Sequence, residues 1–309
     1  MNLTTTAPEI HLVPQQPLTS WCSDAQLSLA APVIVYWLSS ALYAALDHWQ
    51  LAEKYRVHTP EDVAKRNKCT RTEVIKAVLI QQLAQTVLGY IASEFDSVPL
   101  TGHEQFEIWK IGQNLGVPSS VAYGLYWYVF PTMRMFLAFF IMDTWQYFLH
   151  RAMHLNTWLY RTFHSVHHRL YVPYAYGALY NSFIEGLVLD TVGAILSSTC
   201  TGMTPRENIL LFTFSTLKTV DDHCGYEFPW DPLQMVFPNR ATYHDIHHQQ
   251  FGIKTNFSQP FFVHWDLILN SKYAKTEHYI EHNKQIREAK YNQLKEEQHQ
   301  RARTLRKRQ

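Results

Sequence analysis

Residues 150–168 read HRAMHLNTWLYRTFHSVHH, and residues 244–248 read HDIHH. These two stretches contain eight histidines in three clusters of repeated spacing. The eight are His150, His154, His164, His167, His168, His244, His247 and His248. Imidazole is a common ligand for zinc, copper, iron and nickel. Because a structural zinc site closes with four ligands, eight imidazoles predict two metal ions in one site.

The spacing of the histidines also predicts their arrangement. The chain has 17 histidines in 309 residues, so a His-x-x-His-His triplet should arise by chance roughly 0.05 times. Two copies therefore indicate selection for metal binding. On a helix, positions i, i+3 and i+4 share one face. We therefore expect three helical faces, each carrying one cluster, to converge on one pocket, as in di-metal centres built inside helical bundles.

Other features exclude several protein classes. The four cysteines lack Cys-x-x-Cys spacing, which predicts free thiols in a reducing setting. Arg151 stands where the zinc-protease motif His-Glu-x-x-His needs its Glu, so that mechanism has no general base. The net charge of +1 gives no whole-chain attraction to nucleic acid, and we expect no such partner.

Long apolar runs predict an all-α membrane protein. Residues 27–46, LSLAAPVIVYWLSSALYAAL, are 20 uncharged residues, enough to cross a bilayer. Residues 77–92 form a second run, either a tilted span or an interfacial helix. Residues 121–145 form a third, which Pro131 should kink. This third run continues directly into His150, so the first cluster should lie at the end of a membrane helix.

Residues 183–202 and 208–220 are two further apolar runs joined by a turn that ends at Pro205, and they predict a helical hairpin in the membrane. An even number of crossings would leave all three clusters on one aqueous face. The tail, residues 283–309, is polar and ends Arg306-Lys307-Arg308-Gln309, which favours a cytosolic C-terminus. We expect an N-terminal anchor region (1–119), a catalytic domain (120–273) and a basic tail (274–309).

Between residues 130 and 273 the chain resembles the fatty acid hydroxylase/sterol desaturase superfamily, and within it the fungal and plant sphinganine C4-hydroxylases. The phrases that carry this resemblance surround the histidine clusters. They are DTWQYFLHR from Asp143, FHSVHHRLYVPYAYGALYN from Phe163, TLKTVDDHCGY from Thr216 and YHDIHHQQFGIKTNFSQPFF from Tyr243.

The resemblance implies a non-haem di-iron centre at the cytosolic face of the endoplasmic-reticulum membrane. It adds His223 to the eight clustered histidines, which makes nine iron ligands. It implies O2-dependent C4 hydroxylation of sphinganine or dihydroceramide to the phytosphingosine backbone. Two electrons per turnover would come from NAD(P)H through cytochrome b5 and its reductase. Four nearby acids are candidates to orient imidazole N–H groups: Asp143, Asp221, Asp222 and Asp245.

The chain departs from the resembling subfamily at one place. The subfamily usually has Asn-His-Pro where this chain has Asn181-Ser182-Phe183. If the missing histidine tunes the metal centre, this protein would be slower, altered in substrate, or a catalytically weakened paralogue. If that histidine only caps the next helix, Ser182 can replace it, because serine is a good N-cap residue.

Two other functions stay open on the sequence. A related di-iron enzyme, such as a sterol C5-desaturase or C4-methyl oxidase, would use the same histidine clusters on another lipid. A non-catalytic zinc-binding membrane transporter or sensor is the alternative outside the oxygenases. Such a protein needs ionisable residues along its spans, whereas here the histidines cluster outside the apolar runs.

Overall fold

The computed structural model describes residues 6–308, except for the side chains of residues 301, 302 and 305–308. The described chain is almost entirely helical, as predicted. Its α-helices are α1 (Asp24–Trp49), α2 (Pro60–Arg66), α3 (Arg71–Ser93), α4 (Glu104–Leu115), α5 (Ser119–Gly124), α6 (Phe130–Leu155), α7 (Thr157–Leu159), α8 (Phe183–Glu185), α9 (Val192–Thr201), α10 (Pro205–Asp222), α11 (Pro232–Val236), α12 (Ala241–His248), α13 (His264–Ile268) and α14 (Thr276–Arg308).

Shorter elements complete the described chain. The π-helical turns are η2 (Leu125–Val129), η3 (Tyr160–His164) and η6 (Gly186–Thr191). The 3-10 turns are η1 (Glu53–Tyr55), η4 (His167–Arg169) and η5 (Ala175–Gly177). Two short strands, β1 (Val13–Pro14) and β2 (Leu100–Thr101), pair antiparallel. Because π-helical turns occur often at functional sites, η3 and η6 are candidate functional regions.

Local sequence sets where five of the described helices begin. Ser23, Thr59, Thr70, Ser182 and Thr204 are N-cap residues of α1, α2, α3, α8 and α10. Each accepts a hydrogen bond from the backbone N–H three residues later, and the side chain at that position bonds back to the cap. This capping box satisfies N–H groups that have no partner inside the helix.

Four helical segments of the described chain are long and apolar enough to cross a membrane: Asp24–Trp49, Arg71–Ser93, Ser119–Leu155 and Phe183–Thr201. They confirm the apolar runs that begin at residues 27, 77, 121 and 183. The second arm of the predicted hairpin forms helix α10, but α10 is not among these four. Its charged residues, Lys218 among them, keep its hydropathy low. The protein is therefore a multi-pass membrane protein, with α10 packed against α1.

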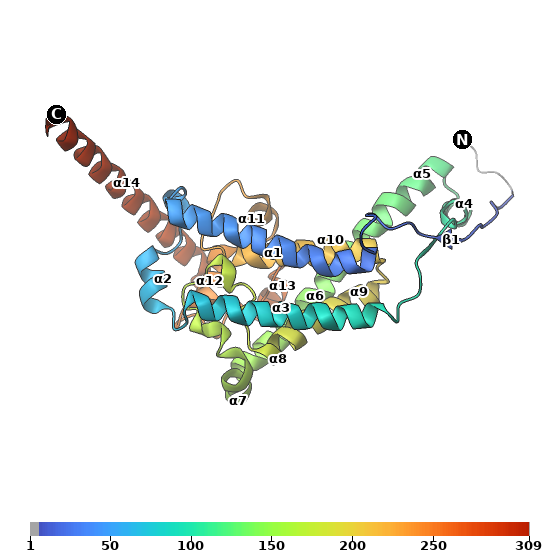
Figure 1. Ribbon diagram of the computed structural model, residues 1–309, viewed down its shortest axis with the longest axis horizontal. Helices are drawn as coiled ribbons and strands as arrows, with labels where there is room; N and C mark the ends of the chain where they lie inside the picture. Colours follow the sequence, from blue (N-terminus) through green and yellow to red (C-terminus); the bar gives the residue numbers. More distant parts are fainter. Residues whose placement is uncertain (1–5, 309) are drawn as a thin grey trace.

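The long helices run up and down between the two ends of this bundle. In Figure 1, α1 and α3 lie side by side, while α6, α9 and α10 lie behind them. Connectivity places the C-terminal ends of α1, α6 and α10 and the N-terminal ends of α3 and α8 at the same end. A hydrogen bond between two of these ends agrees with this placement, because Tyr43 of α1 donates to Asp221 of α10 at 3.3 Å. The histidine clusters lie at this end, hereafter the histidine end.

The third apolar run, in which a kink at Pro131 was predicted, contains a π-helical turn directly before that proline. Helix α5 continues through η2 into α6, and Pro131 is the second residue of α6. Proline has no backbone N–H, and its ring clashes with the carbonyl four residues earlier in a regular α-helix. The wider π turn just before Pro131 accommodates both effects, and the apolar segment remains continuous from Ser119 to Leu155.

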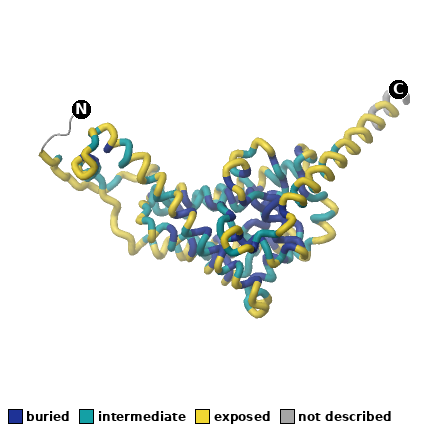
Figure 2. The backbone as a smooth tube through the Cα atoms, turned by 180° about the vertical axis from the view of Figure 1, so that it is seen from behind, coloured by how far each residue is buried: buried dark blue, intermediate teal, exposed yellow. Residues whose placement is uncertain are grey.

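Burial is concentrated at the histidine end of the bundle. Figure 2 shows buried backbone gathered there, whereas the long helices are exposed along much of their length. Exposed apolar side chains include Leu38, Leu83 and Ile195, which are 66%, 67% and 55% exposed. Exposed apolar area on this scale, on helices of spanning length, is a surface for lipid.

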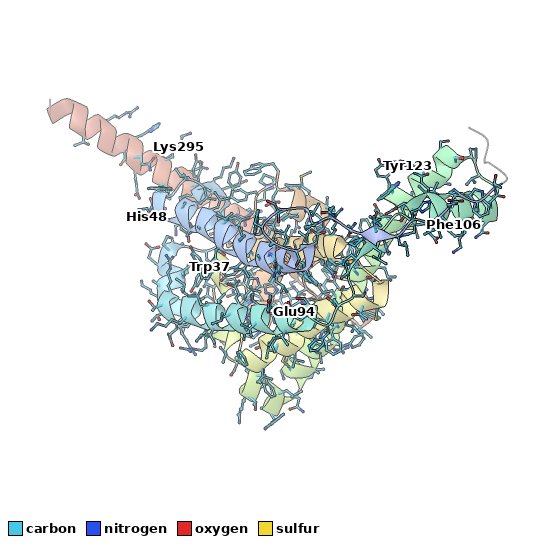
Figure 3. All side chains as sticks on the ribbon, turned by 45° about the vertical axis from the view of Figure 1, so that its right-hand side comes forward. Trp37, His48, Glu94, Phe106, Tyr123 and Lys295 are labelled. Carbon is cyan, nitrogen blue, oxygen red and sulfur yellow. The ribbon has the colours of Figure 1, made fainter. Side chains whose placement is uncertain are left out.

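Two parts of the chain project from the bundle. Helices α4 and α5, which carry Phe106 and Tyr123, form an arm at one end (Figure 3). Helix α14, which carries Lys295, extends from the histidine end (Figure 3). The polar tail predicted from the sequence is therefore helical. The side chains of its basic end, residues 306–309, lie outside the described residues.

Candidate metal centre

All nine predicted ligands come together at the histidine end. His150 and His154 lie in the last turns of α6. His164 ends the π turn η3, and His167 and His168 lie in the 3-10 turn η4. His223 follows the last residue of α10. The third cluster lies on helix α12.

The nine histidines separate into two adjacent groups, in each of which the ligand atoms lie within 4.8 Å of one another. The five-histidine group is His150, His154, His164, His168 and His247. The four-histidine group is His167, His223, His244 and His248. The groups abut, since the rings of His168 and His248 are 4.9 Å apart.

One prediction about the clusters is therefore wrong. We expected each His-x-x-His-His triplet to present one three-ligand face. Instead, His164 and His168 join one group while His167 joins the other, and His247 likewise separates from His244 and His248. Each triplet thus contributes its first and last histidines to one group and its middle histidine to the other. The second triplet divides in this way on the regular α-helix α12, so the division does not depend on irregular helix geometry.

The Nε2 atoms of each group converge. In the five-histidine group, Nε2 of His164 lies 3.0 Å from Nε2 of both His150 and His168. In the other group, Nε2 of His244 lies 3.1 Å from His223 and 3.0 Å from His248. An ion about 2.1 Å from each nitrogen places ligands at right angles about 3.0 Å apart, so the spacing fits metal coordination.

Backbone carbonyls hold the other ring nitrogen of most of these histidines. Because a carbonyl only accepts, Nδ1 carries the proton and Nε2 keeps its lone pair for a metal. The Nδ1-to-oxygen distances are 2.8 Å from His150 to Phe257, 3.1 Å from His167 to Tyr180, 2.9 Å from His223 to Thr219, 2.8 Å from His247 to Thr255 and 2.7 Å from His248 to Leu170. Among the described residues, Nδ1 of His168 and of His244 has no partner.

Burial keeps these imidazoles neutral. It lowers the pKa of His167 to about 4 and that of His223 to about 3. Burial, reinforced by neighbouring histidines, also lowers the pKa values of His164, His168, His244, His247 and His248. Neutral imidazole is the form that binds metals. In the metal-free protein, unprotonated Nε2 atoms face one another without donors between them, and cations placed there would relieve this repulsion.

The four aspartates that were expected to orient the imidazoles form hydrogen bonds and ion pairs with other groups instead. Asp143 accepts from the backbone N–H groups of Phe261 and Phe262 at 3.2 and 2.6 Å. Asp245 contacts His58 Nε2 at 2.8 Å and accepts from Tyr279 at 2.8 Å.

The remaining two aspartates lie on α10. Asp221 accepts from Gln234 at 2.9 Å, and Asp222 pairs with the buried Lys218. All four aspartates therefore hold the backbone and helices around the site and do not contact the ligand rings. The rings are oriented by the backbone carbonyls that accept from their Nδ1 atoms.

Among the described residues, Glu185 is the one carboxylate that contacts a ligand ring, and sequence reasoning missed it. Its Oε1 pairs with Nδ1 of His164, and its side chain is completely buried. The available signal was its position, because a charged residue inside an apolar run marks a functional site. Ser182 caps helix α8 by accepting from the Glu185 N–H at 3.3 Å. The structure therefore supports the capping interpretation of Ser182.

A buried loop supplies two of the orienting carbonyls. Residues 255–262 carry the Thr255 and Phe257 oxygens that hold His247 and His150. Asp266 accepts from the N–H groups of Phe257 and Ser258 at 3.0 and 2.9 Å. The position of the loop, and with it the direction of two ligand rings, therefore depends on Asp266 as well as on Asp143.

Comparison with known proteins agrees with this site. Residues 135–271 match the fatty acid hydroxylase family. A sphingolipid C4-hydroxylase of Saccharomyces cerevisiae is 49% identical over 94% of this chain and 84% of its own. A sphinganine C4-monooxygenase of Arabidopsis thaliana is 45% identical over 81% of this chain and 88% of its own.

Relatives with another named activity also match. A very-long-chain aldehyde decarbonylase of Oryza sativa subsp. japonica is 40% identical over 82% of this chain and 91% of its own. No solved structure matches the chain. Near-complete coverage and high identity to the proteins above establish membership: this chain belongs to the fatty acid hydroxylase family of membrane oxygenases and is similar over most of its length to the sphingolipid C4-hydroxylases.

Proposed function

We propose that this protein is a di-iron monooxygenase that hydroxylates C4 of sphinganine or dihydroceramide and so forms the phytosphingosine backbone of sphingolipids. The observation that carries the proposal is the pair of buried histidine groups at one end of a membrane helix bundle. The names of the relatives that match most of the chain support the choice of lipid.

The overall reaction balances with one external reductant. A C4–H bond is replaced by C4–OH, the second oxygen atom of O2 leaves as water, and two electrons and two protons are consumed. Iron, when bound, supplies the redox chemistry that no side chain can provide. The nine histidines named above are its proposed ligands, five for one ion and four for the other.

The protein's own part is to hold and shield this centre. The carbonyls of Phe257, Tyr180 and Leu170 fix three of the rings so that each lone pair points inward. The ligand side chains are at most 6% exposed, so bulk water is excluded from the centre. Exclusion of water protects a reactive oxidant from side reactions.

Electrons must reach the centre from outside the chain. The sequence contains no Gly-rich dinucleotide fingerprint, and we propose cytochrome b5 and its NAD(P)H-dependent reductase as the donors. The basic tail is suited to dock an acidic partner by electrostatic steering. Reductase-coupled turnover should then fall as salt is added, and turnover that does not respond to salt would argue against this docking.

We propose the endoplasmic-reticulum membrane as the location, with the histidine end in the cytosol. The two connections at the histidine end, residues 50–70 and 156–182, contain seven Lys and Arg residues. Residues 6–23, 94–118 and 202–204, at the other end, contain one, Lys110. The excess of basic residues marks the cytosolic side. The division into regions 1–119, 120–273 and 274–309 stays a prediction.

The proposal is tested by complementation of a yeast strain that lacks its C4-hydroxylase. Sphingoid bases are quantified by mass spectrometry, with His167→Ala as the matched inactive variant. Restored 4-hydroxylated bases support the proposal, and an altered sterol profile instead would indicate a sterol oxygenase. Full activity of His167→Ala would refute the di-iron assignment. If the purified protein holds one loosely bound zinc and consumes no oxygen, it is a non-catalytic metal-binding protein.

A further inference from the structure

An apolar cavity of about 330 Å³ lies between the membrane helices. Side chains of α1, α3, α9 and α10 form most of its wall, among them Leu29, Leu88, Ala194 and Phe212. A cavity of this composition, lined by helices that face lipid elsewhere, is suited to an alkyl chain.

A second, much smaller cavity borders the metal centre. Its lining includes His164 and His167, and its volume is about 20 Å³. That is room for roughly one water molecule. A lipid head group therefore has to stop where the two cavities meet. The residues that line both cavities are Gln146, Asp190, Thr219 and Pro260.

Two of these shared residues, Gln146 and Asp190, can offer polar atoms to a ligand, and Gln146 is the simpler case. Gln146 lies one helical turn before His150 on α6, is only 8% exposed, and its amide has no hydrogen-bond partner among the described residues. The amide offers two donors and one acceptor to a ligand. Thr219, by contrast, already donates to the Ser215 carbonyl at 2.9 Å.

Asp190 is a carboxylate inside a membrane-spanning segment, on the π turn η6. Its Oδ2 accepts from Gln81 at 3.4 Å and from Asn181 at 3.3 Å. Both partners are neutral amides, and no cation of the described residues pairs with Asp190. A carboxylate that has left water without a cation is strongly disfavoured, so a cationic ligand here would stabilise its ionised form.

We propose that Asp190 and Gln146 bind the polar head of a long-chain amino alcohol, with the Asp190 carboxylate paired to its ammonium group. The inference rests on the proposed function and adds a substrate class to it, the free long-chain base over its N-acylated form. In sphinganine the amine is on C2, two bonds from C4. Anchoring the amine where the cavities meet keeps C4 near the small cavity that His164 and His167 line, and leaves the alkyl chain in the apolar cavity.

The test measures binding to the full-length, metal-free protein in lipid nanodiscs, so that it does not depend on turnover. The probes are sphinganine and N-acetylsphinganine, which lacks the cationic amine. Wild type should bind sphinganine at least about tenfold more tightly. Asp190→Asn should remove this preference, because it should weaken the binding of sphinganine alone. Gln146→Met should weaken the binding of both probes. Ser197→Ala, which alters a buried hydroxyl of the neighbouring helix α9, is the control and should change neither.

The outcomes separate the two proposals. Equal affinity of wild type for the two probes overturns the head-group site, and this comparison stands even if Asp190→Asn fails to fold. An Asp190→Asn variant that folds and keeps the preference overturns it as well. If the metal-loaded protein hydroxylates neither lipid while the binding preference follows Asp190, the proposed function fails and the head-group site stands.

Discussion

Glu185 pairs with Nδ1 of His164, and the same glutamate closes the capping box that Ser182 opens at the start of α8. Helix initiation and metal-ligand orientation thus share one side chain. A carboxylate behind a ligand imidazole fixes the ring and raises its basicity. The position that departs from the resembling subfamily is therefore linked to the metal centre through Glu185.

Replacing Glu185 with glutamine should weaken iron binding by about 10- to 100-fold, because the neutral amide cannot polarise the His164 ring as a carboxylate does. Iron content after dialysis against graded chelator measures the effect. Glu207→Gln is the matched control, since Glu207 closes the same type of capping box on α10, far from the histidines. Equal iron retention by the two variants would show that Glu185 acts only as a cap.

Ser182→Ala should lower the free energy of unfolding by about 1 kcal/mol, through loss of the helix cap. Ser182→His should leave hydroxylase activity within about twofold of wild type, because the structure assigns Ser182 a capping role. Thermal unfolding and sphingoid-base analysis check the two variants. A large gain of activity in Ser182→His would instead identify the missing family histidine as a functional group.

Substitution of two adjacent histidines, His167 and His168, should cause the loss of different metal ions. His167 belongs to the four-histidine group and His168 to the five-histidine group. Removing His167 leaves three imidazoles around one ion, whereas removing His168 leaves four around the other. We expect His167→Ala to lose close to one iron of about two per chain, and His168→Ala to keep more. Metal analysis of purified variants decides, and identical losses in both would contradict the division into two groups.

The metal-free protein should lose stability as the solution becomes acidic. His167 and His223 have pKa values of about 4 and about 3 in the folded state, against about 6.5 when unfolded. Below pH ~6.5 the unfolded chain therefore binds protons that the folded chain does not, and stability falls as pH falls towards 4. His167 alone contributes about 3 kcal/mol of this loss. Thermal unfolding from pH 8 to 4 measures it, and a flat profile would contradict the burial of neutral imidazoles.

Gly186 permits the close approach of α3 to η6. A Cβ on Gly186 would lie 2.2 Å from the Gln81 amide carbon. Gly186→Ala should therefore displace Gln81 from Asp190 and destabilise the protein by about 1–3 kcal/mol. Gly124→Ala is the control, because its Cβ would meet nothing within 4 Å. If both variants unfold at the same temperature, the packing around Gln81 is looser than the structure indicates.

The sequence by itself predicted the helices, most of the membrane segments and the eight clustered histidines, and the family resemblance added His223. Helix starts follow from local capping residues such as Ser23 and Thr204, and spans follow from uninterrupted apolar runs. Both signals act over a few neighbouring residues or one helix, so they can be read without knowledge of the fold.

Only the tertiary structure decided how the histidines divide and what orients them. The separation of His167 from His168 depends on which histidines of α6, α10 and α12 meet each of them, and the spacing does not reveal this. The orienting groups are mainly backbone carbonyls, such as that of Phe257, which every residue possesses. The cavity junction at Gln146 and Asp190 likewise requires several helices to meet, because burial and lack of a partner are properties of packing.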